Sequence, residues 1–222
     1  MSYTENAIYD AGIRMDSFGD ANVDVFKNTK AVGYFATMKT RVAEAGEFGS
    51  LRRSSGSAAT SSTNHKSVLR RGVLADLRAI AKTANLMEDE DPNFVNEFKL
   101  LPHNLNYQVT IELAHAFADK GEPLEAEFVS LGLPAGTFAD LRADTAALEA
   151  ANRQKGAAGT TRVGANAQLD EVLKGILDAR RGIDVVARNL FRDNPQKLAE
   201  WMTASHIERS PTRARNGGNP TT

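Results

Sequence analysis

A glutamate and a histidine three positions apart, Glu112 and His115, form the strongest match to a chemical motif in this sequence. Residues at this spacing lie on one face of a helix, and helical di-iron proteins take a Glu-x-x-His pair from each of two helices. The chain contains no second Glu-x-x-His. We therefore expect a surface pair and no metal site, and a helical metalloprotein is the least favoured function. The expected buried face of this helix carries Leu105, Val109, Leu113, Ala116 and Phe117.

Other chemical motifs are missing from the sequence. The chain has no cysteine, which excludes disulfides, thiolate metal sites and cysteine nucleophiles. No Gly-x-Ser-x-Gly elbow marks a serine nucleophile. A zinc site needs three or four converging ligands, and nothing brings the histidines together. We expect no catalytic residue and no cofactor, and a non-enzymatic role is favoured. The scattered histidines are His65, His103, His115 and His206.

One stretch differs from the rest of the chain in its charge. The formal net charge is only −1, yet no acidic residue occurs between Glu47 and Asp76. Basic side chains beside a flexible segment can contact phosphates, or they can pair with acids near helix ends, which is the simpler interpretation. No aromatic residue interleaves these charges, so we expect no base-stacking platform. The candidates for anion or nucleic-acid binding are Arg52, Arg53, Lys66, Arg70 and Arg71.

Two glycines seven positions apart, Gly175 and Gly182, lie on one side of the most regular helical segment. Each costs about 1 kcal/mol of helix stability relative to alanine. The close approach of a neighbouring helix is the expected compensation. That helix could belong to the same chain, which we favour, or to another subunit. The candidate packing interface comprises Gly175, Ile176, Gly182 and Ile183.

Helices are expected to position all of these residues, because apolar side chains recur at intervals of three and four. The last long helix has an apolar seam from Leu169 to Leu190. Asn194 and Pro195 predict the start of a short final helix, with asparagine as its N-cap. These patterns predict an all-α fold, an up-and-down bundle of about six helices. Earlier helices are expected over about 4–26, 29–52, 66–87 and 105–120, and one after Pro134 that weakens at 156–159.

The predicted domain organisation depends on residues 54–64, which include no large apolar residue. We expect this segment to be a flexible Ser-rich loop or linker. A single helical-bundle domain over 1–207 is favoured, and the alternative is a linker that separates an N-terminal helical pair from the rest. Residues 208–222 are expected to be a disordered tail. No apolar run approaches the ~20 residues of a membrane span. The sequence start lacks a signal-peptide pattern, so a cytoplasmic protein without membrane contact is expected.

Four short segments carry a resemblance to known sequences. They are EFKLLP at 97–102, FRDNP at 191–195, LAEW at 198–201 and HIERSP at 206–211. On these segments, and in the same order, the chain resembles an uncharacterised family of bacterial helical proteins of similar length. The resemblance implies a bacterial origin and a helical fold, and it implies no activity, cofactor or site residue.

The sequence thus favours a structural or interaction protein, which we expect to associate with itself or with another helical protein. This expectation depends on the uninterrupted apolar seam and on the lack of any converging polar cluster. The alternative is an accessory protein that binds nucleic acid or another anion through residues 52–71.

Overall fold

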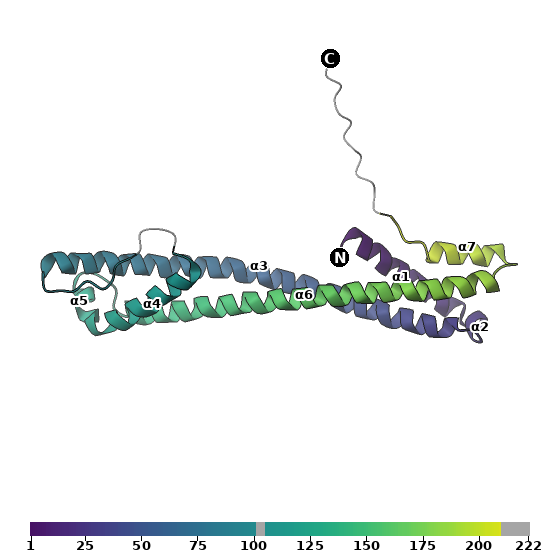
Figure 1. Ribbon diagram of the computed structural model, residues 1–222, viewed down its shortest axis with the longest axis horizontal. Helices are drawn as coiled ribbons and strands as arrows, with labels where there is room; N and C mark the ends of the chain where they lie inside the picture. Colours follow the sequence, from purple (N-terminus) through teal and green to yellow (C-terminus); the bar gives the residue numbers. More distant parts are fainter. Residues whose placement is uncertain (101–104, 210–222) are drawn as a thin grey trace, which may run out of the picture. The chain divides into compact units, whose positions relative to one another are not determined.

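Helices make up most of the computed structural model, which describes residues 1–100 and 105–209 (Figure 1). The predicted all-α fold of about six helices is confirmed, and no strand occurs in these two ranges. No helix of the described residues is sufficiently long and apolar to span a membrane. The elements are α1 (Tyr3–Ala21), α2 (Val23–Phe26), α3 (Ala31–Glu90), α4 (Tyr107–Gly121), η1 (Glu122–Leu124), α5 (Glu125–Ser130), α6 (Thr137–Leu190) and α7 (Pro195–Ala204).

Contacts divide the chain into two compact units, and each unit has its own apolar core. The terminal unit combines residues 1–54 with the chain from residue 161 onward, and the central unit comprises residues 55–160. The N-terminal helices therefore belong with the C-terminal ones, an arrangement that neither sequence-based alternative included. The single domain over 1–207 stays a prediction. The predicted tail lies outside the described residues from 210 onward.

An aromatic cluster forms one part of the terminal unit's core. The ring of Phe18 lies 5.5 Å from Trp201 and 6.1 Å from Phe191, measured between centroids, and Phe26 lies 5.7 Å from Phe191. Such tilted and edge-to-face pairs stabilise a core beyond the area that they bury. Trp201 is fully buried, and its Nε1 donates a hydrogen bond of 2.9 Å to Asp184 Oδ1. This bond satisfies the one polar atom of the indole.

The short final helix begins as predicted. Asn194 is the N-cap of α7, and its Oδ1 accepts a hydrogen bond of 3.1 Å from the backbone nitrogen of Lys197. Pro195 occupies the first helical position, where its missing N–H costs nothing because that amide would have no partner inside the helix. The cap positions α7 so that Trp201 enters the core.

The central unit has a core of four phenylalanines in edge-to-face contact. Phe98 lies 5.3 Å from both Phe117 and Phe128, and Phe128 lies 5.1 Å from Phe138. Phe98 comes from a non-helical segment that Asn96 holds against α3. The buried Asn96 donates to Asn85 Oδ1 and Glu88 Oε2, and its own Oδ1 accepts from the backbone nitrogen of Phe98.

The expected loop at 54–64 is wrong, because these residues form an uninterrupted part of α3. Their hydroxyl groups bond to backbone carbonyls one turn earlier, with Thr60 Oγ1 3.1 Å from Gly56 O and Thr63 Oγ1 2.8 Å from Ala59 O. A hydroxyl used in this way does not compete for the backbone in a non-helical conformation. The segment also contains no proline, so every backbone N–H can donate. The expected weak point at 156–159 is likewise helical, within α6.

Candidate functional site

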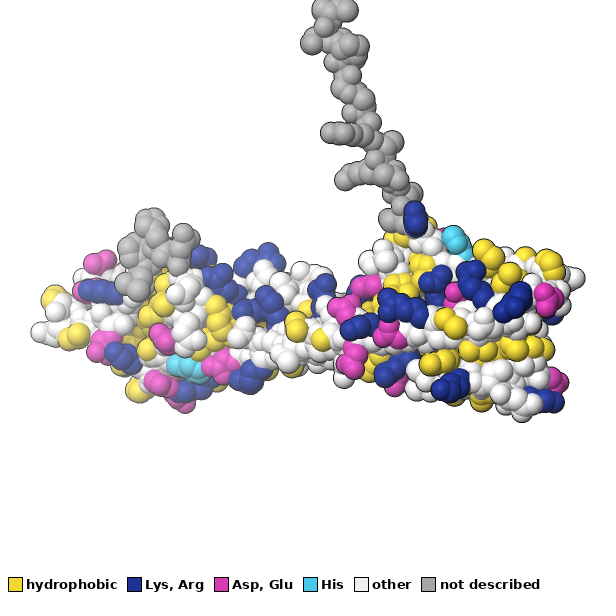
Figure 2. Space-filling view, turned by 45° about the vertical axis from the view of Figure 1, so that its right-hand side comes forward, with side chains coloured by type: hydrophobic (Ala, Val, Ile, Leu, Met, Phe, Trp, Pro, Cys, Tyr) yellow, Lys and Arg dark blue, Asp and Glu magenta, His cyan; other side chains and the backbone are white. Residues whose placement is uncertain are grey.

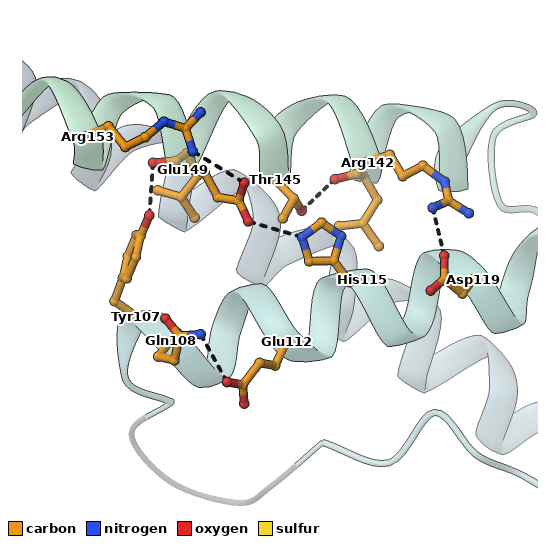
Figure 3. A network of polar contacts seen from close by, with 11 residues as sticks. Tyr107, Gln108, Glu112, His115, Asp119, Arg142, Thr145, Glu149 and Arg153 are labelled. Carbon is orange, nitrogen blue, oxygen red and sulfur yellow. Dashed lines mark hydrogen bonds and ion pairs between the residues drawn. The ribbon is translucent and has the colours of Figure 1, made fainter.

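Glu112 and His115 do not form the expected surface pair. His115 on α4 contacts Glu149 on α6, with 3.2 Å between Nε2 and Oε1, as Figure 3 shows. Glu112 points away from α6 in the same view, and its Oε1 accepts a hydrogen bond of 3.0 Å from Gln108 Nε2. The second oxygen of Glu149 lies 3.8 Å from Arg153 Nη1. The two motif residues therefore have separate partners and share no ligand position.

The buried face of α4 explains this difference. Large apolar residues were expected to mark it, yet Val109 and Leu113 are only half-buried. Phe117 is buried as expected, and the other buried positions include small residues such as Gly121, which let a neighbouring helix approach. A Cβ on Gly121 would lie 2.0 Å from the ring of Phe138. The helix is therefore rotated so that His115 borders α6. The buried residues of α4 are Thr110, Ile111, Ala114, Phe117, Ala118 and Gly121.

The polar network around His115 joins two helices. The hydroxyl of Thr145 donates to Leu141 O at 2.7 Å, and the hydroxyl of Tyr107 donates to Leu148 O at 3.2 Å. Arg142 on α6 binds Asp119 at 2.7 Å (Figure 3) and Glu122 at 2.8 Å. Each of these groups is used in a contact within or between helices. The network thus holds α4 against α6 through side-chain contacts.

The histidines remain apart where they can be located. His65 is exposed on α3 in the central unit, whereas His206 lines a pocket in the terminal unit. His103 lies outside the described residues. Across residues 1–100 and 105–209, no three histidine, aspartate or glutamate side chains are grouped so that they could hold a metal ion.

The five basic candidates do not form one cluster. Arg52 and Arg53 belong to the terminal unit, and the other three belong to the central unit. Arg52 Nη1 lies 3.0 Å from Glu5 Oε1. Burial raises the pKa of Glu5, but the hydrogen bonds from Arg52 and from the Ser2 backbone outweigh it, so the pKa is lowered. Arg53 is exposed. For Arg52, therefore, the simpler interpretation of pairing with an acid describes the contact.

A third cation, Lys155, acts electrostatically on Lys66 together with Arg70, and the sequence did not indicate it. Lys66 Nζ lies 2.5 Å from Asn152 Oδ1 and 3.7 Å from the ring centroid of Tyr107. Burial lowers the pKa of Lys66, and the positive charges of Lys155 and Arg70 lower it further. Arg70 Nη2 donates to the carbonyl of Leu105. Figure 2 shows several Lys and Arg side chains gathered on the central unit, over α3.

The remaining basic candidate, Arg71, lies on α3 beside this group. Its Nε donates to the carbonyl oxygen of Ser67, 3.4 Å away, within the same helix. Arg71 is exposed, whereas Lys66 and Arg70 are half-buried. No aromatic residue interleaves these charges along the chain, but Tyr107 comes from a distant segment and lies beneath Lys66.

Gly175 and Gly182 lie against α3 of the same chain. A Cβ on Gly175 would lie 3.0 Å from Arg41 Nε, and a Cβ on Gly182 would lie 2.6 Å from the ring of Tyr34. Their neighbours Ile176 and Ile183 are fully buried in the terminal core. Side chains of the chain itself therefore occupy the glycine-marked side.

α1 carries the same arrangement on its own glycines. Gly12 and Gly19 are also seven positions apart, and a Cβ would lie 2.8 Å from Val42 Cγ2 at the first and 2.5 Å from the Phe35 ring at the second. Consecutive residues of α3 thus contact glycines of α1 and of α6. This spacing in α1 was a readable signal that the sequence analysis missed.

A groove of about 830 Å³ lies between α1 and α7 in the terminal unit. Its apolar lining includes Phe18 and Ala199, and Ile13 at its edge is 41% exposed. An adjoining pocket of about 510 Å³ includes Met202, which is 52% exposed. The groove is lined by Ile13, Arg14, Ser17, Phe18, Gln196, Ala199, Glu200, Thr203 and Ala204.

Comparisons of the chain with protein-family models, with curated proteins and with solved structures return no match. The resemblance to a family of bacterial helical proteins therefore stays a prediction.

Proposed function

We propose that this chain is a non-enzymatic helical interaction protein that binds a second copy of itself through the α1/α7 groove. The apolar lining of this groove is the observation that carries the proposal. Large exposed apolar side chains in a concave surface are typical of sites where proteins associate. Ile13 provides such a side chain beside the buried Phe18, and Met202 provides another in the adjoining pocket.

A second copy is favoured over an unrelated helix because of the charges around the groove. Arg14 lines it from α1, and Glu200, which also pairs with Lys197 at 2.8 Å, lines it from α7. In a two-fold interface each surface meets the same surface of the other copy, so a patch with both signs of charge can complement itself. The apolar seam of α6 is not available for this purpose, because Leu169, Ile176 and Ile183 are buried in the chain's own core.

Light scattering on the purified full chain tests self-association. Burying an exposed isoleucine stabilises an interface by up to about 2 kcal/mol, and a two-fold interface contains Ile13 twice. The two copies together contribute up to about 4 kcal/mol, so Ile13→Glu should weaken the dimer by up to about 700-fold, since 1.4 kcal/mol corresponds to about tenfold in Kd. Val23→Glu is the matched control, because Val23 is 61% exposed and lies outside the groove.

Two results would contradict this function. A monodisperse monomer at micromolar concentration refutes self-association. Equal loss of the dimer in Ile13→Glu and Val23→Glu refutes the groove as the interface. If the wild type is monomeric but Ile13→Glu alone loses binding to a different helical protein, the partner is that protein and a second copy is excluded.

A further inference from the structure

Three cations meet in the central unit without a carboxylate to balance them. Lys66 and Arg70 lie one turn apart on α3, and Lys155 lies one turn from Asn152 on α6. The contact between Lys66 Nζ and Asn152 Oδ1 brings the two helices together at this point. We propose that this basic cluster of Lys66, Arg70 and Lys155 binds the phosphate groups of a nucleic-acid backbone, a role independent of the self-association proposed above.

Several other cations of the same unit are paired with acids, although Arg71, Arg78 and Lys82 have no ion pair within the described residues. Lys120 Nζ lies 2.9 Å from Glu97 Oε2, and Arg142 Nη1 lies 2.7 Å from Asp119 Oδ1. Within the described residues, none of the three cluster cations has an acidic partner at ion-pair distance. Lys66 contacts a neutral amide and Arg70 a neutral carbonyl. The cluster therefore holds net positive charge that an external anion can neutralise.

Mutual repulsion makes this arrangement costly unless an anion is bound. Like charges held close together disfavour one another's charged form. Burial is the largest cause of the lowered pKa of Lys66, and the positive charges of Lys155 and Arg70 lower it further. A phosphate placed among the three would reverse the repulsion, and charge-assisted hydrogen bonds from these cations would hold it.

The position of Tyr107 bears on whether a nucleic acid would be bound by base stacking or by phosphate contacts. The Lys66 ammonium lies over its ring at 3.7 Å, and the hydroxyl of the same tyrosine is bonded to Leu148 O. That face of the ring is therefore covered and cannot stack on a base, which is how many single-strand binders hold their ligand. Contacts limited to the backbone phosphates are independent of sequence and depend strongly on salt.

Salt-dependent binding of a short fluorescent DNA duplex of arbitrary sequence, followed by anisotropy, is the test. Three neutralised phosphates predict a slope of about −2.7 in the plot of log K against log salt concentration. The double variant Lys66→Gln/Lys155→Gln removes two of them and should leave a slope of about −0.9. Arg78→Gln/Lys82→Gln is the matched control, with the same charge change at exposed positions of α3, and it should keep the wild-type slope.

A single variant protects the test from a folding defect, because Lys66 also packs on Tyr107. Lys155 is exposed, so Lys155→Gln alone should keep the helical circular dichroism spectrum and reduce the slope by about 0.9. The proposal is overturned if the wild type shows no DNA binding at low salt, or if the cluster and control variants have equal slopes. It is also overturned if polyglutamate or inorganic phosphate alone binds the cluster as tightly as the duplex does.

Discussion

Replacing Gly121 by alanine should destabilise the protein, although alanine is the better helix former. Gly121 ends α4, and a Cβ added there would lie 2.0, 2.4 and 2.5 Å from three atoms of the Phe138 ring. Carbon atoms in contact prefer about 3.5 Å or more, so the ring must move by roughly 1.5 Å. Phe138 is 1% exposed and lies 5.1 Å from Phe128, so its movement disturbs the aromatic core.

The expected magnitude follows from two opposing effects. Overpacking a rigid core costs about 1–3 kcal/mol. The gain in helix propensity is at most about 1 kcal/mol and is smaller at a helix end. Gly121→Ala should therefore lower the free energy of unfolding by about 1–2 kcal/mol. For a chain of this size, that corresponds to a Tm lower by roughly 2–8 °C.

Gly156→Ala is the matched control in the same unit. Nothing lies within 4 Å of a Cβ at this position in the interior of α6. Here the propensity gain acts alone, so we expect a stabilisation of about 1 kcal/mol. Urea unfolding followed by far-UV circular dichroism measures both variants. The reasoning is refuted if Gly121→Ala is as stable as the wild type, or if Gly156→Ala is less stable.

Two aspartates give predictions of opposite sign. Burial and the charges of Asp144 and Asp140 raise the pKa of Asp76, so its ionisation opposes folding above that raised pKa and the effect fades as the pH falls. Asp76→Asn should then stabilise the protein at pH 7, by less than ~1 kcal/mol because solvent screens the charges. Denaturant midpoints measured at pH 7 and pH 4 should show that this gain is smaller at pH 4. Burial raises the pKa of Asp184, but hydrogen bonds from Arg188 and Trp201 outweigh this effect, so the pKa is lowered. The ionised Asp184 therefore stabilises the folded protein above pH 3.8, and this stabilisation is lost as the pH falls through the lowered pKa. Asp184→Asn should lower the free energy of unfolding by about 1–2 kcal/mol at neutral pH. It should also make that free energy fall less steeply at acidic pH, and an unchanged acidic pH dependence would contradict this assignment.

Local patterns predicted the helices well where one periodic face packs into a core. The seam residues Leu169, Ile176 and Ile183 are buried as their spacing requires, and the Asn194–Pro195 start of α7 follows from cap chemistry within four residues. Segment 54–64 was mispredicted for a different reason. Its lack of large apolar residues indicates that it buries little apolar surface. Such a segment can still be helical when no residue interrupts the backbone hydrogen bonds of the helix.

The candidate site was less predictable, because distant segments build it. The basic cluster includes Lys155, which is far from Lys66 in the sequence and has no local pattern to link the two. The face of α4 was misjudged because burial there includes Ala114, Ala118 and Gly121, and at Gly121 the missing side chain leaves room for Phe138. Apolar periodicity weighs large side chains and undervalues such close approaches.

The division of the chain into two units has a consequence for the order of folding during synthesis. The central unit is one continuous stretch, 55–160, so all its contacts become available once that stretch has left the ribosome. The terminal unit joins the first 54 residues to a segment that begins at residue 161. Its core must wait for Ile176, Ile183 and Trp201 to be translated, and until then Met15 and Phe18 lack their partners. Early exposure of such residues favours aggregation and a need for chaperones, so truncation before α7 should harm the N-terminal helices more than it harms residues 55–160.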